Sequence, residues 1–271
     1  MSDRMETPAS MGTRRFGRVN WLGFYTLIWR EIRRFTEVWT QTILAPLMTS
    51  ALFMAIFAVA IGPSRGDVMG VPFVQFLAPG ILAMTVIQNA FVNTSSSLMV
   101  SKVQGNIVDT LMPPLSPLEL VIGFIAGGLA RGLVVGVVIW AALALALGIT
   151  VAHPLIALLF VALGAIFIGG LGILAGILAN KFDQMAAITN FIITPLSFLS
   201  GTFYSVQALP PAVQGVIHYN PVFYLIDGVR YGFIGQSDSA PALGLLVLGV
   251  SCLLVTGLCW YWFRIGYRLK S

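Results

Sequence analysis

Charged residues are scarce in this chain. Asp, Glu, Lys and Arg make up only 9% of its 271 residues, whereas 58% are hydrophobic and the mean hydropathy is +0.91. Because soluble domains carry about 25% charged residues, this composition excludes a water-soluble core with a membrane tail. The scarcity is greatest in six long apolar runs, residues 39–62, 73–101, 120–148, 154–179, 185–204 and 240–263. These runs contain no Asp or Glu and a single basic residue, Arg131.

The lack of acidic residues in these runs also bears on how transport could be driven. Proton-driven carriers usually bury Asp, Glu or His in their spans, and self-sufficient carriers often show inverted repeats. The sequence shows neither feature. If the chain takes part in transport, the energy is therefore expected to come from another subunit. A secondary transporter is the alternative interpretation.

Catalytic and nucleotide-binding motifs are missing as well. The sequence contains no G-x-x-x-x-G-K-[ST] loop for phosphates, no G-x-S-x-G and no H-E-x-x-H. Asp109, Glu119 and Asp183 are scattered, whereas a lipid-modifying enzyme would cluster acids or histidines at one interface. Cys252 and Cys259 lie in the last apolar run and are expected to be small core residues. We therefore expect no enzyme activity, metal or cofactor in this chain.

The six apolar runs predict the fold. A helix needs roughly 20 apolar residues to cross the hydrocarbon layer, and lipid cannot satisfy bare backbone groups, so such runs must be helices. The chain is expected to be all-α, with a disordered cytoplasmic tail at residues 1–17 and a single transmembrane domain at residues 18–271. The expected spans cover about residues 39–62, 73–101, 117–148, 154–179, 185–204 and 240–263.

The net charge of +5 could suggest a nucleic-acid partner, but the distribution of the basic residues indicates a membrane orientation instead. Twelve of the fifteen basic residues precede the first run, follow the last or lie in alternate loops, and only Arg65 and Arg230 lie on the other side. Cytoplasmic loops of membrane proteins carry the excess of Lys and Arg. Both termini are therefore predicted to be cytoplasmic, in agreement with an even number of spans.

Residues 18–38 predict an amphipathic helix ahead of the first span. Arg30, Arg33 and Arg34 lie on one arc, and the opposite arc carries apolar and aromatic residues such as Trp29 at three- and four-residue steps. A basic amphipathic helix with aromatic residues on its apolar side lies in the plane of the membrane interface. This helix could be a simple anchor, or it could also be a docking surface for a partner.

The loop between the second and third spans predicts a short amphipathic helix. Val103, Ile107 and Leu111 share one face at four-residue spacing, and Pro113 and Pro114 then stop the helix. Such a helix is either an interfacial connector or a peg that enters a groove in a soluble partner. The residues of the loop favour neither interpretation over the other.

The third and fourth spans are rich in glycine at close spacing, which lets helix backbones approach each other. We expect these glycines to pack helices within the chain, with a subunit interface as the alternative. Arg131 in the third span is a functional candidate, because charges inside a membrane are costly. It could instead lie near the cytoplasmic end of a long helix and extend its guanidinium to the interface.

Residues 205–239 are too hydrophobic for an ordinary external loop. They predict a short helix, then Pro221, then a second helix in which Asp227 and Arg230, three residues apart, could pair. We expect this segment to be re-entrant, dipping into the outer leaflet where protein buries it.

An ordered set of motifs in the last third of the chain resembles the signature of the membrane permeases of type 2 ABC exporters. The motifs are residues 195–204 (PLSFLSGTFY), 209–211 (LPP), 219–221 (YNP) and 227–231 (DGVRY). The residues that carry the likeness are Ser200, Gly201, Tyr204, Pro210, Asn220, Pro221, Asp227 and Arg230. The resemblance covers almost the whole chain and is strongest to small bacterial permeases for drugs, antibiotics or polysaccharides. Ser205 departs from the pattern, because the family often has proline there, so the form of this external turn is left open.

The resemblance implies partners and a mechanism. Two copies of the permease would pair, and each would sit on a separate cytosolic ABC ATPase that binds ATP and Mg. The helix around Gly105, Ile107, Asp109 and Leu111 would be the coupling helix that enters the ATPase cleft, with Asp109 where family members usually have an acid. The conducting path would lie at the dimer seam, lined by spans one, two and five.

The protein implied by the resemblance is a multi-pass protein of the bacterial plasma (inner) membrane. It would export an amphipathic, lipid-linked or drug-like substrate by alternating access. A secondary transporter and a non-catalytic membrane scaffold are the alternatives. The direction of transport rests on the resemblance alone, and neither the substrate nor the particular ATPase follows from the sequence.

Overall fold

The computed structural model describes residues 19–268. The tail expected at residues 1–17, and Arg18 at the start of the expected amphipathic helix, lie outside the described residues. Within the described part of the chain nearly everything is helical, and β-structure is limited to an isolated bridge between Val68 and Val71. The expected all-α fold is confirmed.

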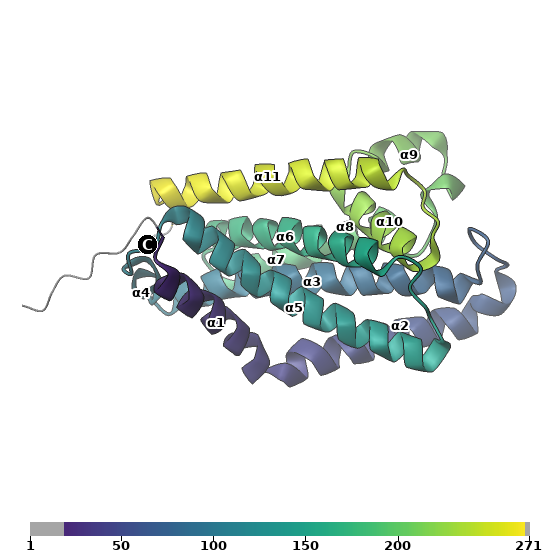
Figure 1. Ribbon diagram of the computed structural model, residues 1–271, viewed down its shortest axis with the longest axis horizontal. Helices are drawn as coiled ribbons and strands as arrows, with labels where there is room; N and C mark the ends of the chain where they lie inside the picture. Colours follow the sequence, from purple (N-terminus) through teal and green to yellow (C-terminus); the bar gives the residue numbers. More distant parts are fainter. Residues whose placement is uncertain (1–18, 269–271) are drawn as a thin grey trace, which may run out of the picture.

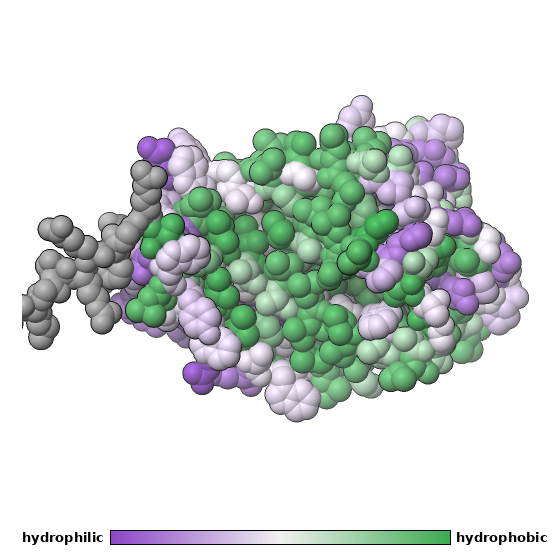
Figure 2. All heavy atoms as spheres, in the orientation of Figure 1, coloured by the Kyte–Doolittle hydropathy of each residue, from purple (hydrophilic) through white to green (hydrophobic). Residues whose placement is uncertain are grey.

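Six helices of the described chain are long and apolar enough to cross a membrane, and they lie side by side in one bundle (Figure 1). Each begins and ends within three residues of the span predicted from the sequence. They cover Thr40–Ser64, Phe73–Val103, Pro117–Leu147, Pro154–Leu178, Phe182–Thr202 and Pro241–Ile265. Figure 2 shows apolar side chains over the middle of the bundle and polar ones toward its two ends. A bilayer around the middle of the bundle would match this pattern.

Four of the spans are single helices, and two are built from several helical segments. The single helices are α3 (Phe73–Val103), α5 (Pro117–Leu147), α6 (Pro154–Leu178) and α11 (Pro241–Ile265). The first span joins η1 (Thr40–Leu44), α2 (Ala45–Ala60) and η2 (Gly62–Ser64). The fifth joins α7 (Phe182–Ile188), η3 (Thr189–Ile193), α8 (Thr194–Ser197) and η4 (Phe198–Thr202). The elements outside the spans are α1 (Trp21–Glu37), α4 (Ile107–Leu111), η5 (Val206–Ala208), α9 (Pro211–Ile217) and α10 (Pro221–Ile234).

The two ends of the bundle carry different elements. The start of α1, α4 and the end of α11 lie together at one end, which we call the α4 end (Figure 1). The α9 helix lies at the opposite end, which we call the α9 end. α10 packs inside the bundle at that same end. The first and last described helices thus meet at the α4 end, as six crossings require.

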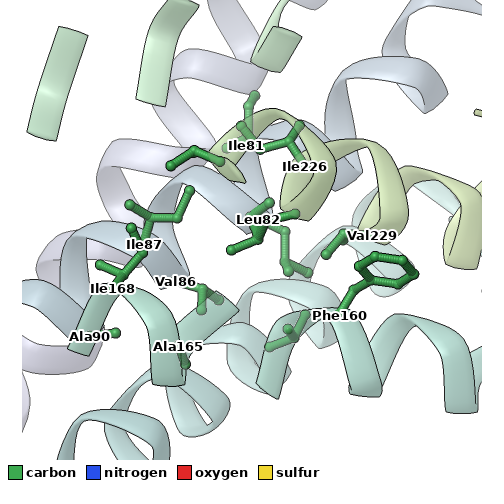
Figure 3. Packing of buried hydrophobic residues seen from close by; sticks show 14 of the residues in the cluster. Ile81, Leu82, Val86, Ile87, Ala90, Phe160, Ala165, Ile168, Ile226 and Val229 are labelled. Carbon is green, nitrogen blue, oxygen red and sulfur yellow. The ribbon is translucent and has the colours of Figure 1, made fainter. Parts of the chain in front are cut away.

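α3 is the central helix, and it packs against α5, α6 and α10. Figure 3 shows its apolar side chains between those of α6 and α10. The labelled side chains are Ile81, Leu82, Val86, Ile87 and Ala90 of α3, Phe160, Ala165 and Ile168 of α6, and Ile226 and Val229 of α10. The most apolar stretch of α3 is 83% buried, whereas that of the first span is only 11% buried. The core of the chain therefore lies around α3, and the first span borders it.

Glycines bring α3, α5 and α6 into close contact. Thr94 Oγ1 on α3 donates a hydrogen bond to the carbonyl of Gly169 on α6 at 2.8 Å. A Cβ added at Gly172 would lie 2.7 Å from the carbonyl oxygen of Phe91, and one at Gly128 would lie 2.9 Å from the Thr94 methyl group. Any larger residue at these positions would push the helices apart. The expected packing of helices within the chain is confirmed for these glycines.

The first and fifth spans each contain a wide helical turn directly before a proline. The N–H of Ala45 donates to the carbonyl of Thr40, five residues back, and the N–H of Thr194 donates to that of Thr189 in the same way. A proline follows immediately in both spans. Proline has no N–H for the carbonyl four residues back, so the regular hydrogen-bond pattern cannot pass through it. Both spans are therefore locally irregular, a feature frequent at functional sites.

The segment between the fifth and sixth spans forms the two helices expected from the sequence. α10 is buried throughout residues 222–230, whereas α9 exposes Val213 and Val216. Gly228 of α10 packs directly against the ring of Phe160 on α6, which holds α10 close to the bundle. The burial of α10 by protein agrees with a re-entrant segment, and its position in the outer leaflet stays a prediction.

Candidate functional site

Several residues of the expected external signature meet in a buried junction at the α9 end. Arg230 is fully buried, and its Nη2 donates to the carbonyl oxygen of Gly201 at 2.5 Å. Its guanidinium carbon lies 4.1 Å from the ring centroid of Phe76. Nη1 lies 4.0 Å from Asp227 Oδ1 and 3.8 Å from Asp238 Oδ2. The structure thus brings together the pair expected from the three-residue spacing and adds a second carboxylate to it.

Both carboxylates also hold the loop that precedes α11. Asp227 accepts hydrogen bonds from the backbone N–H of Asp238 at 2.7 Å and from the N–H and hydroxyl of Ser239 at 2.9 and 2.7 Å. Burial raises the pKa of the Asp227 carboxyl, and these bonds and the neighbouring guanidinium oppose the shift. Asp238 in turn accepts from the N–H of Val206 at 2.9 Å and from the hydroxyl of Ser205 at 2.5 Å. Ser205 therefore supplies a bond that proline, the residue common in the family, could not.

Asn220 and Gly201 shape the backbone around this junction. Asn220 Oδ1 accepts the N–H of Val222 at 3.0 Å and so caps α10, while its Nδ2 donates to Ser200 Oγ at 2.7 Å. Gly201 has a φ of +85°, which favours glycine and ends the fifth span. Pro221 is the first residue of α10, where a missing N–H breaks no helical bond.

The remaining two signature residues have simpler roles. The hydroxyl of Tyr204 donates to the carbonyl of Leu199 at 2.5 Å, and Pro210 is exposed directly before α9. The signature therefore joins the end of the fifth span, α10 and the start of α11. Across residues 19–268, no group of three or more His, Cys, Asp and Glu side chains is placed to hold a metal ion.

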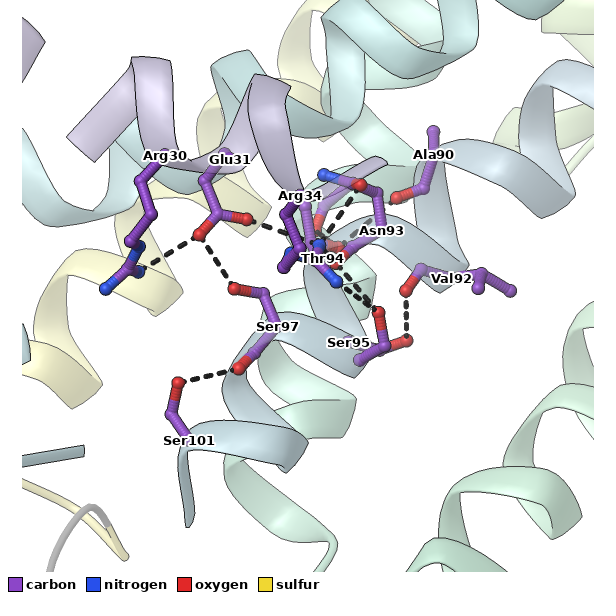
Figure 4. A network of polar contacts seen from close by, with 12 residues as sticks. Arg30, Glu31, Arg34, Ala90, Val92, Asn93, Thr94, Ser95, Ser97 and Ser101 are labelled. Carbon is purple, nitrogen blue, oxygen red and sulfur yellow. Dashed lines mark hydrogen bonds and ion pairs between the residues drawn. The ribbon is translucent and has the colours of Figure 1, made fainter. Parts of the chain in front are cut away.

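A buried carboxylate organises the α4 end of the bundle (Figure 4). Glu31 on α1 has an exposed fraction of 0%, and its side chain lies against Gly127 of α5. Its Oε1 accepts hydrogen bonds from Arg30 Nη2 at 3.0 Å and from Ser97 Oγ at 2.8 Å, and its Oε2 accepts one from Arg34 Nη2 at 3.3 Å. α1 is therefore tied to α3 and α5 through one buried acid.

The two arginines extend this contact to α3 and α4. Arg34 Nη2 also donates to the backbone carbonyl of Asn93 at 2.6 Å and to its side-chain oxygen at 3.1 Å. Arg30 Nη1 donates to Thr110 Oγ1 on α4 at 3.0 Å. Because each guanidinium has several N–H groups in one plane, each arginine bonds Glu31 and a second helix at the same time.

The three arginines expected on one polar arc of α1 therefore differ. Arg30 and Arg34 both bond Glu31, although Arg30 is partly exposed, whereas Arg33 lies 3.9 Å from the exposed Glu37. Besides polar residues, α1 exposes four large apolar or aromatic side chains: Trp21, Leu22, Tyr25 and Trp29. The amphipathic helix is present, and its position in the membrane interface stays a prediction.

The apolar residues Ile107 and Leu111 of the expected amphipathic helix form the face by which α4 packs on the bundle. Ile107 is buried and Leu111 packs against the same apolar cluster, so this face attaches α4 to the bundle. Val108, Asp109 and Met112 are exposed instead. Any partner at this end would therefore meet the exposed residues, together with Gly105, which is exposed just before α4.

A cleft separates α1 from the ends of α3 and α4. Its volume is about 640 Å³, and its lining includes Arg30, Arg33, Arg34, Ser101, Gln104 and Asp109. It brings together the expected α1 arginines and the expected coupling residue Asp109. A polar cleft at this end can receive a charged or polar group from solution.

Arg131 lies half-way along the bundle rather than near an end. It is 14 residues after the start of α5 and 16 before its end, and its Nε donates to Asn89 Oδ1 at 3.1 Å. Asn89 is likewise in the middle of α3. At 1.5 Å per residue the nearer end of α5 is about 21 Å away, so the guanidinium lies within the bundle rather than at its end. Its depth relative to the membrane surface stays a prediction.

Arg131 borders a groove between the first, second, third and fifth spans. The groove has a volume of about 410 Å³. Its lining residues include Gln41, Thr49, Ser50, Phe53, Thr85, Gln88, Asn89, Arg131 and Phe198. The hydroxyl, amide and guanidinium groups in this otherwise apolar groove are unusual for an apolar bundle, because intramembrane polar groups are costly and are commonly functional.

Sequence reasoning did not single out Glu31, Asn93 or Thr110. Glu31 lies between arginines on a helix whose polar arc was expected to face water, so its pattern matched an exposed residue. Asn93 falls within an apolar run, one helical turn after a second amide, Asn89. Two amides in an apolar run were the one sequence feature that could have indicated a functional position. These three residues acquire their roles from contacts across 59 to 80 positions of sequence.

Six apolar spans, a polar cleft at one end and a polar groove half-way along the bundle define a multi-pass helical membrane protein of the permease class. The family model of the ABC-2 type transporter matches residues 23–234, from α1 through α10. The chain belongs to this family. It is a membrane subunit of an ABC transporter, and the family implies a partner ATPase.

Two named relatives support the assignment over most of the chain. The inner membrane transport permease YadH of Escherichia coli (strain K12) is 36% identical over 251 residues, which cover 93% of this chain and 98% of the relative. Nodulation protein J of Rhizobium leguminosarum bv. viciae is 27% identical over 243 residues, which cover 88% of this chain and 90% of the relative. Together with the six apolar helices, these findings identify a multi-pass inner membrane protein.

Proposed function

We propose that this chain is the permease of an exporter in which a separate cytosolic ATPase binds ATP and Mg and catalyses hydrolysis. The permease itself would carry neither the catalytic residues nor a cofactor. The α4 end would be cytoplasmic, which agrees with the excess of basic residues in the segments at that end.

The observation that carries the proposal is the form of α4. This short helix is fixed to the bundle by Ile107 and exposes Val108, Asp109 and Met112 at the α4 end. An exposed helical turn with apolar side chains and one acid suits insertion into a groove of a soluble partner. We therefore assign the ATPase contact to this exposed face with Gly105, while Ile107 and Leu111 support it from within.

A second copy of the chain is the proposed partner within the membrane. The first span exposes Met48, Leu52 and Ile56, and the fifth exposes Phe191 and Leu199. The groove beside Arg131 lies between these two spans and α3. Pairing of two copies along the first and fifth spans would place both grooves near the seam, where a path lined by spans one, two and five is expected.

The proposed substrate is an amphipathic, lipid-linked or drug-like molecule that moves outward by alternating access. The cleft at the α4 end and the groove beside Arg131 both combine polar and apolar side chains, which suits such a molecule. The relatives are named as a transport permease and a nodulation protein, so the outward direction rests on the resemblance to exporters.

The first experiment is purification of the full chain from its native cells in a mild detergent. Identification of co-eluting proteins and an assay of ATP hydrolysis then follow. A stoichiometric soluble ATPase supports the proposal. An isolated chain, under conditions that preserve other membrane complexes, contradicts it and favours a secondary carrier or a scaffold.

A charge reversal at α4 tests the coupling assignment. Asp109→Lys should leave membrane insertion intact and abolish hydrolysis that depends on transport, because Asp109 is exposed on the proposed contact face. Asp183→Lys is the matched control, since Asp183 is also exposed and lies in the first turn of α7, the other short helix that begins at the α4 end. Unchanged coupled turnover in Asp109→Lys, or equal loss in both variants, would contradict the role of α4.

A further inference from the structure

The groove between the first, second, third and fifth spans has one positive charge and no acid. Arg131 uses its Nε on Asn89, and across residues 19–268 no hydrogen bond or ion pair joins its two terminal nitrogens to a protein acceptor. Asn89 is oriented by two bonds, since its Oδ1 accepts from Arg131 and its Nδ2 donates to the carbonyl of Thr85 at 3.0 Å. Four N–H donors of a guanidinium are thus open to the groove.

A second copy of this chain would not neutralise Arg131 at the same depth. The only acids within the six spans are Glu119 and Asp183, which are the third residue of α5 and the second residue of α7. Glu119 is 12 residues from Arg131, or about 18 Å along the helix at 1.5 Å per residue. A homodimer therefore brings no carboxylate to the middle of the membrane, where an unpaired charge is costly.

Unused donors continue along the same face of α3 toward the α4 end. Asn93 lies one turn from Asn89, and its Nδ2 is buried without a partner in the described structure. The same is true of the Nε of Arg34, whose guanidinium bonds the oxygen of Asn93. Buried polar groups without partners are rare. Two buried donors without partners therefore lie on the side of α3 between the cleft and the groove.

The remaining lining of the groove is apolar or neutral. Phe53, Met84, Val92 and Phe198 border it, beside the hydroxyl and amide groups of Thr49 and Gln88. Such a lining can accept a hydrocarbon chain next to a head group that carries acceptor oxygens. A phosphate or carboxylate would satisfy the open guanidinium donors with charge-assisted hydrogen bonds.

We propose that this groove binds the anionic head, a phosphate or carboxylate, of an amphiphile, with Arg131 as its principal ligand. The inference extends the proposed function by naming the charge of the substrate class. The same chemistry could come from a transported amphiphile or from an anionic phospholipid of the bilayer, and the test separates these two sources.

The test measures binding to the full chain in a neutral maltoside detergent by native mass spectrometry. The probes are monooleoylglycerol phosphate and the uncharged monooleoylglycerol, which share one acyl chain. The wild type should bind the phosphate at least about tenfold more tightly, the factor that one charge-assisted hydrogen bond supplies. Arg131→Gln should remove this preference, and Arg131→Lys should keep part of it.

Two further variants keep the result interpretable. Gln88→Glu puts a carboxylate in the groove without changing the residues of the Arg131–Asn89 bond, and it should also remove the preference. Arg264→Gln removes an exposed arginine at the end of α11 and should leave the preference unchanged. Circular dichroism checks that each variant is folded. No preference in the wild type, or a preference that survives both Arg131→Gln and Gln88→Glu, overturns the proposal.

The source of the anion is decided in vesicles of phosphatidylcholine that contain the permease with its co-purified ATPase. Stimulation of ATP hydrolysis by the phosphate probe in the wild type, but not in Arg131→Gln, identifies a transported amphiphile. Phosphatidylglycerol that stays bound through Arg131 without changing hydrolysis identifies a resident lipid, and both results support the anionic site. Because binding is measured on the permease alone, failure to find an ATPase would contradict the transporter proposal and leave the binding result standing.

Discussion

The buried junction at the α9 end makes a quantitative prediction about stability. Arg230→Met keeps a long apolar side chain but removes the guanidinium that bonds Gly201, stacks on Phe76 and faces Asp227 and Asp238. Breaking a buried ion pair by removing one partner costs about 3–5 kcal/mol, and a desolvated cation–π contact contributes about 2 kcal/mol. The two are not additive.

The hydrogen bonds that remain in Arg230→Met decide where in the range of about 3–5 kcal/mol the loss of stability falls. Asp227 keeps three donors and Asp238 keeps two, so neither carboxylate is left without partners. We therefore expect a loss near the lower limit, about 3 kcal/mol. The loss should be accompanied by loosening of the loop before α11, because both acids hold that loop.

SDS-induced unfolding in mixed maltoside micelles, followed by circular dichroism, measures the change. Arg65→Met is the matched control, since Arg65 also lies over a phenylalanine of α3, at 5.1 Å from the centroid of Phe73, but is exposed. An exposed cation–π contact contributes about 0.5–1 kcal/mol, so this variant should be close to the wild type. A loss below about 1 kcal/mol in Arg230→Met, or equal losses in the two variants, would refute the account of the junction.

Two further predictions concern the α4 end. Glu31→Ala should destabilise the protein by about 1–3 kcal/mol in the same assay, because it leaves the partly buried Arg34 without its acid. The exposed Glu37→Ala should change stability by less than about 1 kcal/mol, and similar losses would argue against an organising role for Glu31. Thr110→Val keeps the shape of the side chain but removes the Arg30 bond. It should leave ATPase binding intact and lower transport-coupled hydrolysis severalfold, and full coupling in that variant would exclude a role for this bond.

The spans could be predicted closely because lipid leaves a chain few alternatives. A long apolar run without charge must be helical, and polar or turn-forming residues such as Pro117, Pro154 and Pro241 mark where helices begin. The position of α4 was predicted for a similar reason, since its amphipathic period and the prolines after it are local. Which face of α4 is free depends on what packs there, and the sequence pattern did not decide it.

The candidate site was less predictable because its contacts are distant in sequence. The Asp227–Arg230 pair was accessible from helical spacing, but Gly201, which accepts the Arg230 bond, is 29 residues away. Arg131 was visible as a lone charge in an apolar run, but its partner Asn89 is 42 residues away in sequence. Glu31 gave no signal, because a buried acid between arginines has the same local pattern as an exposed one.

The contacts at the α4 end and the irregular spans indicate how motion at α4 could reach the groove. α4 is bonded to α1 through Thr110 and Arg30, and α1 continues through residues 38–39 into η1 and the first span. That span is little buried and has a wide turn before its proline, as the fifth span does. Arg131 and Asn89 belong to α5 and α3, the latter held tightly to α6 by glycine contacts, and α1 is tied to both helices through Glu31. A shift of α4 would therefore reach the two sides of the groove by different routes: through the wide turn of the first span on one side, and through the Glu31 contact with α3 and α5 on the other.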